Sequence, residues 1–287
     1  MEIVGKSGIN LTLAVLGTGQ MGRGIVQLAL QRGMKVIFVS RTQQRLAAVQ
    51  NEIETFFLKS MSKQEAGTLL QDNLLLSTNM ASVAEADVVI ESVTEDRTAK
   101  KNLFSVLNKV CSSKTIIVTN TSSLSVTELA EGIDNPSRVA GLHFFNPVHK
   151  MELVEIIRTA QTSDETINFL TELSEKLGKK PVLAKDNPGF IVNRVLIPYL
   201  LEAVHLFEQG VGKEDIDQAA KLGLNHPMGP LALIDFIGVD IFQNIIKNLH
   251  DATSDQKFTT PIVIKKMINE GKLGRKSGGG FYSYLKS

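Results

Sequence analysis

The sequence has little of what marks secreted or nucleic-acid-binding proteins. Its 287 residues include a single cysteine, Cys111, so no disulfide can form within the chain and a reducing compartment is expected. Lysine and arginine together number 31, aspartate and glutamate 30, and no basic block disturbs that balance. A nucleic-acid partner is therefore not expected, and any attraction to an anionic ligand has to be local.

Long apolar stretches and targeting patterns are missing as well. The apolar runs fall short of the ~20 residues that a membrane helix needs. The opening stretch, MEIVGKSGIN, carries neither a signal-peptide nor a transit-peptide pattern. We expect a cytoplasmic protein with no membrane partner, and we predict no metal site.

Apolar runs and helix-like stretches alternate along most of the chain. With 43% hydrophobic residues the chain can bury a large core and form two domains. The runs are continuous and rich in β-branched residues, which is typical of parallel strands buried on both faces. Strands are predicted at 11–17, 34–40, 86–92, 114–120, 138–144, 151–157 and 181–185, and helices at 20–32, 42–66, 96–111, 124–131 and 164–177.

This alternation predicts an α/β fold, a Rossmann-type doubly wound parallel sheet in residues 1–187 with a helical insertion near 42–70. After the turn signal at Pro188-Gly189 almost every segment is helix-like. Residues 188–287 are therefore predicted to form a smaller, all-helical domain. Its helices are expected at 191–210, kinked by Pro198, and at 213–224 and 238–250.

A glycine-rich loop follows the first predicted strand. In LAVLGTGQMGRG, Gly17 permits a tight turn, Gly19 lets a pyrophosphate approach the backbone, and Gly22 lets helix and strand pack closely. The helix that follows, beginning with Gln20 and Met21, presents backbone N–H groups to the phosphates. The pattern indicates a dinucleotide site, although a glycine-rich turn without a ligand has the same local sequence.

The second predicted strand ends without the usual acidic residue. In NAD enzymes an Asp or Glu about 20 residues beyond the glycines binds the adenosine ribose, and here that position is Ser40. A hydroxyl accepts a 2′-phosphate as partner, Arg41 adds a forked cationic donor, and Arg45 lies four residues on. We therefore predict a preference for NADP(H), with NAD(H) as the alternative.

Ordered motifs extend over nearly the whole chain. They are GTGQMGRGI, ESVTED, NTSSLS, HFFNP, PGFIVNR, NHPMGPL, DFIGVD and GRKSGGGFY. Together they resemble the 3-hydroxyacyl-CoA dehydrogenase family, and most of all its bacterial 3-hydroxybutyryl-CoA branch. The resemblance implies hydride transfer between a nicotinamide cofactor and a short-chain 3-hydroxyacyl-CoA or 3-oxoacyl-CoA.

The resemblance also implies roles for individual residues. His143 would be the catalytic acid/base, paired with Glu155, a combination suited to proton transfer near neutral pH. Ser122 and Asn193 would hydrogen-bond the reacting oxygen. The remaining expected cofactor contacts are Glu95, Lys100, Asn120 and Asn146.

Structural readings of these residues stay open. His143 could be a hydrogen-bonded core histidine, while Ser122 and Asn193 could cap helices. A purely structural role is harder to assign to Glu155, because burying a carboxylate inside an apolar strand costs free energy unless it has a partner. A crystallin-like dinucleotide-binding protein with a structural role is the alternative from another class.

The coenzyme A contacts and the assembly are predicted from two lysines and one apolar helix. Lys59 and Lys63, spaced i, i+4 on one predicted helix, are candidate CoA ligands or a solvated face. The apolar helix at 191–210 needs covering, so a homodimer through the helical domain is expected. The segment 148–152 departs from the family pattern by adding charge, which leaves the acyl-chain preference open. The sequence gives neither the physiological direction nor the pathway.

Overall fold

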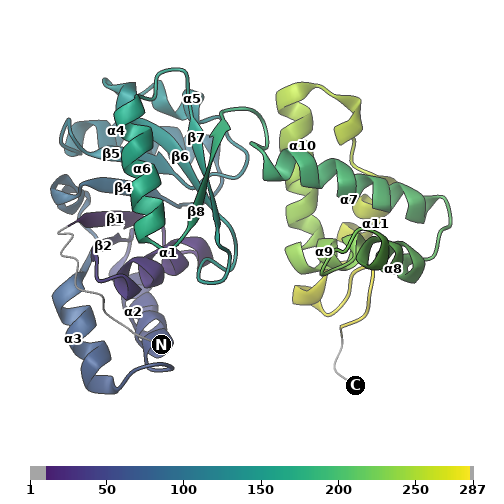
Figure 1. The fold of residues 1–287 in the computed structure, drawn as a ribbon, viewed down its shortest axis with the longest axis horizontal. Coiled ribbons are helices and arrows are strands. Elements are labelled where there is room, and N and C mark those ends of the chain that lie inside the picture. Colours follow the sequence, from purple (N-terminus) through teal and green to yellow (C-terminus); the bar gives the residue numbers. More distant parts are fainter. Residues whose placement is uncertain (1–10, 285–287) are drawn as a thin grey trace. The chain divides into compact units, whose positions relative to one another are not determined.

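A computed structural model describes residues 11–284 (Figure 1). The chain forms two compact units that divide between Asn187 and Pro188. Each unit has its own apolar core, so each is described by itself.

An eight-stranded sheet forms the centre of the first unit (Figure 1). Its strand order is β3-β2-β1-β4-β5-β6-β7-β8, and the first six strands have the doubly wound order of dinucleotide-binding folds. This confirms the predicted fold class. The strands are β1 (Thr12–Leu16), β2 (Lys35–Val39), β3 (Leu74–Ser77), β4 (Val88–Glu91), β5 (Ile116–Thr119), β6 (Val139–Phe144), β7 (Leu153–Arg158) and β8 (Lys180–Lys185).

Helices follow most strands of this unit and cover the sheet. The central strands β1, β4 and β6 have almost no exposed side chains, as expected for strands covered on both faces. The helices are α1 (Gln20–Gln31), α2 (Gln43–Phe57), α3 (Lys63–Asn73), α4 (Arg97–Val110), α5 (Val126–Ala130) and α6 (Asp164–Lys176), with short 3₁₀ turns η1 (Met80–Glu85) and η2 (Pro136–Arg138).

The helical insertion after β2 differs from the prediction. One helix was expected over 42–66, but α2 ends at Phe57 and α3 begins at Lys63. Ser62 starts the new helix through a capping box, in which its hydroxyl accepts from the Glu65 N–H and the Glu65 carboxylate accepts from the Ser62 N–H. The edge strand β3, four residues long and mostly half-buried, was not predicted.

The direction of β7 also differs from the prediction of a wholly parallel sheet. β6 and β7 pair antiparallel, and β8 runs parallel to β7. A parallel pair needs a crossover of about a dozen or more residues, and only residues 145–152 connect Phe144 to Leu153. The chain therefore turns back directly, which makes His143 and Glu155 direct cross-strand neighbours.

The second unit is helical, as predicted. Its longest helix, α7, contains Pro198 and buries Ile197, Leu200 and Val204. The C-terminal segment is anchored to this unit, because Phe281 is buried and the Tyr282 hydroxyl donates to Asp217. The helices are α7 (Val192–Glu208), α8 (Lys213–Gly223), α9 (Pro230–Ile237), α10 (Val239–Thr253) and α11 (Ile262–Asn269), with turns η3 (Gln256–Phe258) and η4 (Arg275–Ser277).

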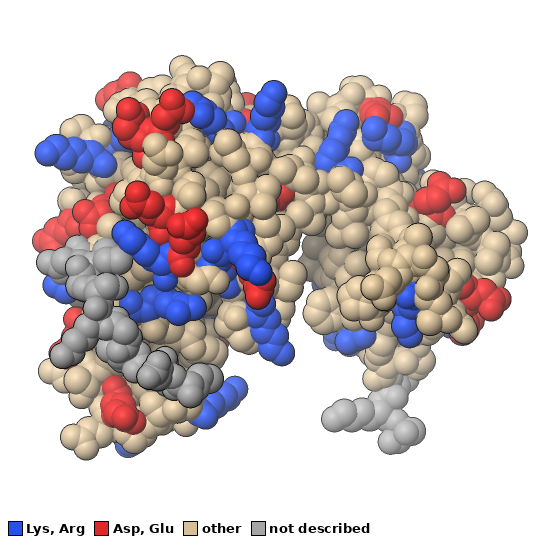
Figure 2. All heavy atoms as spheres, viewed as in Figure 1, with Lys and Arg blue, Asp and Glu red and all other residues tan. Residues whose placement is uncertain are grey.

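The surface agrees with the balanced composition. Acidic and basic side chains are interspersed over the face drawn in Figure 2. Among residues 11–284, no helix combines the length and apolar character that crossing a membrane demands.

Candidate functional site

The loop between β1 and α1 has the backbone that a dinucleotide requires. Gly17 adopts φ 108°, and a Cβ on it would overlap the Ser92 carbonyl. A Cβ on Gly22 would overlap the Gly17 carbonyl, so helix and loop pack closely there. Around Gly19 a Cβ would meet nothing within 4 Å, and no side chain caps α1. Open space at an uncapped helix N-terminus fits a pyrophosphate.

The residues after β2 lie beside this loop. Ser40 is half-buried and Arg41 is exposed. The Arg45 guanidinium is already engaged, because Nε donates to Thr18 Oγ1 at 3.1 Å and Nη2 to the Thr18 carbonyl at 3.2 Å. Arg45 thus ties the start of α2 to the glycine loop.

His143 and Glu155 form a buried pair on the β6–β7 hairpin. The His143 Nδ1 lies 2.8 Å from Glu155 Oε2, and the two residues are 6% and 1% exposed. The Phe145 ring packs on the imidazole with centroids 4.5 Å apart. A carboxylate at Nδ1 orients the ring and favours proton exchange at Nε2. The cross-strand register of the hairpin therefore places a carboxylate against a histidine, an arrangement that is able to exchange a proton.

Glu95 holds the loop that carries Ser122. Its Oε1 accepts from Thr121 Oγ1 at 2.6 Å and from the backbone N–H groups of Ser122 and Ser123 at 2.9 and 3.1 Å. Burial, the largest single influence, raises the pKa of Glu95. The charge of Lys100 and these hydrogen bonds outweigh burial and hold the pKa below its usual value. The loop is thus fixed by an ionised carboxylate.

Lys100 is fully buried between two acids, one of which was not predicted. Its Nζ lies 2.7 Å from both Glu91 oxygens and 3.4 Å from Glu95 Oε2. The sequence held a signal for Glu91, namely an acid at the end of the apolar run ADVVIE, since a buried carboxylate needs a partner.

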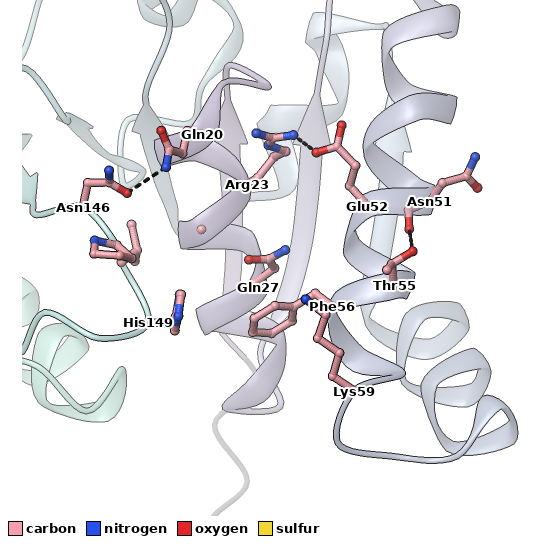
Figure 3. A pocket seen from close by; sticks show the side chains of 13 residues that line it. Gln20, Arg23, Gln27, Asn51, Glu52, Thr55, Phe56, Lys59, Asn146 and His149 are labelled. Atoms are coloured by element: carbon pink, nitrogen blue, oxygen red, sulfur yellow. Dashed lines mark hydrogen bonds and ion pairs between the residues drawn. The ribbon is translucent and has the colours of Figure 1, made fainter. Parts of the chain in front are cut away.

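The two asparagines hold loops around the same edge of the sheet. Asn120 accepts from the Phe144 N–H at 2.9 Å and donates to Ser92 Oγ at 3.2 Å. The amide of Gln20 at the start of α1 donates to Asn146 Oδ1 at 3.1 Å (Figure 3). These bonds link the glycine loop and β5 to the end of the β6 strand.

A pocket of about 440 Å³ lies between α1, the end of α2 and the segment after β6 (Figure 3). Arg23 pairs with Glu52 in it, and Phe56 packs against His149 with ring centroids 6.0 Å apart. The lining residues are Gln20, Arg23, Gly24, Gln27, Asn51, Glu52, Thr55, Phe56, Lys59, Asn146, Pro147, Val148 and His149.

The predicted lysine pair is corrected by this geometry. Lys59 lies just beyond the end of α2 and lines the pocket, whereas Lys63 begins α3 and does not. A new helix, α3, begins at the Ser62 capping box between the two lysines. They therefore do not share one helix face. Asn193 belongs to the second unit, where it is buried in the first turn of α7.

Family models match both units. The model of the 3-hydroxyacyl-CoA dehydrogenase NAD-binding domain matches residues 12–187, and that of the C-terminal domain matches residues 189–284. The chain is 42% identical to a 3-hydroxybutyryl-CoA dehydrogenase of Clostridioides difficile over 96% of this chain and all of the relative. It is 43% identical to the mitochondrial hydroxyacyl-coenzyme A dehydrogenase of Sus scrofa over 95% of this chain and 90% of that one.

A solved structure agrees with these sequence matches. The (S)-3-hydroxybutyryl-CoA dehydrogenase of Ralstonia eutropha superposes with a TM-score of 0.88 at 37% identity, covering 96% of this chain and 99% of that one. Matching models over both units and high identity over nearly the whole length show that the chain belongs to the 3-hydroxyacyl-CoA dehydrogenase family.

Proposed function

We propose that the protein interconverts a short-chain 3-hydroxyacyl-CoA and the 3-oxoacyl-CoA, with NADP(H) as the preferred cofactor. The observation that carries this proposal is the His143–Glu155 pair, with 2.8 Å between Nδ1 and Oε2. It lies at the end of β6, the region where open α/β sheets bind their ligands. Family membership supplies the reaction class, and the pair supplies its proton.

The bound cofactor gives or takes the hydride, and the protein handles the proton. Glu155 accepts the Nδ1 hydrogen of His143, so the proton that reaches the substrate oxygen is exchanged at Nε2. In the reductive direction the imidazolium donates, stabilised by the Glu155 carboxylate, and in the oxidative direction the neutral ring accepts. Burial of the pair excludes water that would weaken this interaction.

Ser122 and Asn193 are proposed to hydrogen-bond the reacting oxygen. Glu95 accepts from the Ser122 N–H, which fixes the backbone from which the hydroxyl projects. In the structure the Ser122 hydroxyl donates to Glu95 Oε1 at 3.3 Å, so we propose that it exchanges this bond for one to the substrate oxygen. Glu95, Lys100, Asn120 and Asn146 are proposed to shape the cofactor end of this site.

The cofactor preference rests on the end of β2. Ser40 and the exposed Arg41 stand where an acid would repel a 2′-phosphate. Arg45 adds charge beside the glycine loop through its bonds to Thr18. The alternative is NAD(H), with Arg41 stacked on the adenine ring.

Reduction of acetoacetyl-CoA with matched NADPH and NADH tests both parts. We expect kcat/KM to favour NADPH by about tenfold or more, equivalent to about 1.4 kcal/mol. Arg41→Ala should reduce that ratio without changing kcat with NADH, and Lys63→Ala serves as the matched control. A preference for NADH would contradict the cofactor proposal alone, whereas no turnover with either cofactor would contradict the reaction. A crystallin-like role predicts the latter result.

We propose that the pocket beside α2 takes the anionic part of coenzyme A. Lys59 and His149 line it, and Lys63 is a second, weaker candidate outside it. Lys59→Ala should raise the KM for acetoacetyl-CoA several-fold but leave that for acetoacetyl-pantetheine, which lacks the nucleotide phosphates, unchanged. Lys63→Ala, at the candidate outside the pocket, should raise this KM less, and Lys109→Ala, at an exposed lysine of α4 that does not line the pocket, is the matched control. Equal effects of Lys59→Ala on both thioesters would contradict the assignment.

The second unit is proposed to be the dimerisation domain. Several of its apolar side chains are exposed, among them Val195, Leu222 and Ile262 at 69%, 76% and 79%. Exposed apolar side chains of this size would be covered from water in an interface between two copies of the chain. Sedimentation velocity should show a homodimer, and a monomer at micromolar concentration would contradict this. The cytoplasmic location stays a prediction.

A further inference from the structure

Glu91 is a buried carboxylate that the proposed reaction does not use. It ends β4, is 0% exposed, and accepts from Thr119 Oγ1 at 2.6 Å and the Val93 N–H at 2.7 Å. Both of its oxygens also accept from Lys100 Nζ at 2.7 Å. An ionised pair this deeply buried is costly unless its geometry is well satisfied. The presence of this buried ion pair at the edge of the site therefore needs an explanation.

The contacts of Lys100 supply an explanation for the buried pair, because they extend to the loop that carries Ser122. Lys100 Nζ lies 3.4 Å from Glu95 Oε2, while the other Glu95 oxygen accepts from the N–H groups of Ser122 and Ser123. Lys100 is 0% exposed and Glu95 is 32% exposed. The chain of contacts therefore runs from a rigid strand, through a fixed ammonium, to a more exposed carboxylate and then to the loop.

The distances show which acid holds the ammonium. Lys100 is closer to Glu91, at 2.7 Å, than to Glu95, at 3.4 Å. Without the Glu91 charge, Coulomb attraction would draw the buried ammonium toward Glu95. A tighter Lys100–Glu95 pair would compete with the loop N–H groups for the same carboxylate. The Glu91 charge thus leaves Glu95 available to the loop.

We infer that Glu91 is a positioning residue, which holds Lys100 so that Glu95 can fix the 121–123 loop and its Ser122. The inference rests on the proposed function only in giving Ser122 a role toward the substrate. The relay itself is a property of the protein alone. It can therefore be measured without cofactor or substrate.

Hydrogen exchange of the full-length protein tests the relay directly. In Glu91→Gln, amide exchange at Ser122 and Ser123 should accelerate about fivefold to tenfold, as expected for loss of one net hydrogen bond. Exchange in β4 and β5 should change less. The kcat for acetoacetyl-CoA should fall by a similar factor, with KM for the nicotinamide cofactor within about twofold. Glu91→Asp, which keeps the charge, should recover part of both losses.

Thr115→Val is the matched control, because Thr115 is buried immediately before β5 of the same sheet and its hydroxyl donates to the Ala86 carbonyl at 2.9 Å. It should lower stability and leave loop exchange and kcat unchanged. Unchanged exchange at 122 and 123 in Glu91→Gln would overturn the relay, as would equal acceleration throughout β4 and β5. If Glu91→Gln does not fold, Glu91→Asp carries the same comparison with Thr115→Val.

A double variant tests whether Glu91 acts through Lys100. Glu91→Gln/Lys100→Met should lose no more kcat than Lys100→Met alone, because the two residues share one path. Additive losses would overturn the inference. His143→Gln measured in parallel separates the two proposals: if it retains full turnover, the proposed function fails, while the exchange data still decide the relay.

Discussion

Both units of the chain bury carboxylates, but they partner them differently. In the first unit, Glu155 faces His143 and Glu91 faces Lys100, so each acid meets a group that carries or exchanges a proton. In the second unit, Asp217 and Asp235 accept from backbone N–H groups and tyrosine hydroxyls.

The two arrangements serve different purposes. Asp235 accepts from the N–H groups of Phe281 and Tyr282 at 2.9 Å each, which joins α9 to the C-terminal segment. Gly280 lies so close that a Cβ on it would overlap the Asp235 carboxylate. Backbone donors have fixed protonation, so such a site fastens chain segments, whereas a histidine partner can move a proton. Burial of an acid therefore does not by itself indicate chemistry.

The largest expected effect tests the first half of that comparison. His143→Gln should lower kcat for acetoacetyl-CoA reduction by roughly 10²- to 10⁴-fold, because it removes the proton donor. Cofactor affinity, measured by fluorescence titration, should change little. Turnover close to that of the unaltered protein would show that the buried pair is structural, like the pair of aspartates in the second unit.

Asp235→Asn tests the second half. An amide group in place of one oxygen faces an N–H donor and leaves it unsatisfied, so the free energy of unfolding should fall by about 1–3 kcal/mol. Chemical denaturation measures this loss, and kcat well below the melting temperature should stay unchanged. A loss of kcat with unaltered stability would assign Asp235 to the chemistry instead.

A smaller effect is a difference in the sign of pH dependence. Burial raises the pKa of Glu95, but the charge of Lys100 and the loop hydrogen bonds outweigh burial and lower it. The contribution of Glu95 to the free energy of unfolding is therefore present above about pH 4.3 and is lost as pH falls through the folded pKa. Burial raises the pKa of Asp235. Its contribution to the free energy of unfolding is therefore present below about pH 3.9 and is lost as pH rises through the folded pKa.

Thermal unfolding between pH 3 and 7 measures both signs. The stability difference between the unaltered protein and Glu95→Gln should shrink as pH falls. The difference for Asp235→Asn should grow over the same range. Parallel slopes for the two variants would mean that the acids do not differ in the way their partners suggest.

The smallest effect is expected at an exposed ion pair. Lys180 Nζ lies 2.6 Å from Glu152 Oε2, with the side chains 78% and 69% exposed. Exposed pairs contribute little because water screens them. Glu152→Gln should leave the melting temperature and kcat unchanged within error, and a clear loss of either would show that proximity outweighs burial in this protein.

Much of the fold could be predicted because burial shapes the composition of strands. β1, β4 and β6 are continuous apolar runs, and that pattern predicts covered parallel strands. β3 escaped prediction because its sequence, LLLS, is only four residues long, and so short an apolar run does not distinguish a strand from the end of a helix. The break between α2 and α3 could have been found, since Ser62 and Glu65 form the S-x-x-E capping pattern.

From residue patterns alone, the sequence predicts those features of the site that depend on the type of a single residue. The glycine loop depends on backbone freedom, which Gly17 displays in the sequence itself. The contacts of Glu95 with Ser122 and Ser123 join segments 27 and 28 residues apart, and no local pattern encodes them. Likewise, the partner of Lys100 at Glu91 becomes visible only when β4 and α4 are placed together.

The reversal between β6 and β7 limits how this protein can evolve. The connection at 145–152 carries Asn146 and His149 into the pocket, and it also sets the register of His143 against Glu155. A slip of one residue in a strand turns every side chain to the opposite face. Natural variation in substrate range should therefore accumulate as substitutions in this segment, whereas insertions and deletions that move the register should be removed by selection.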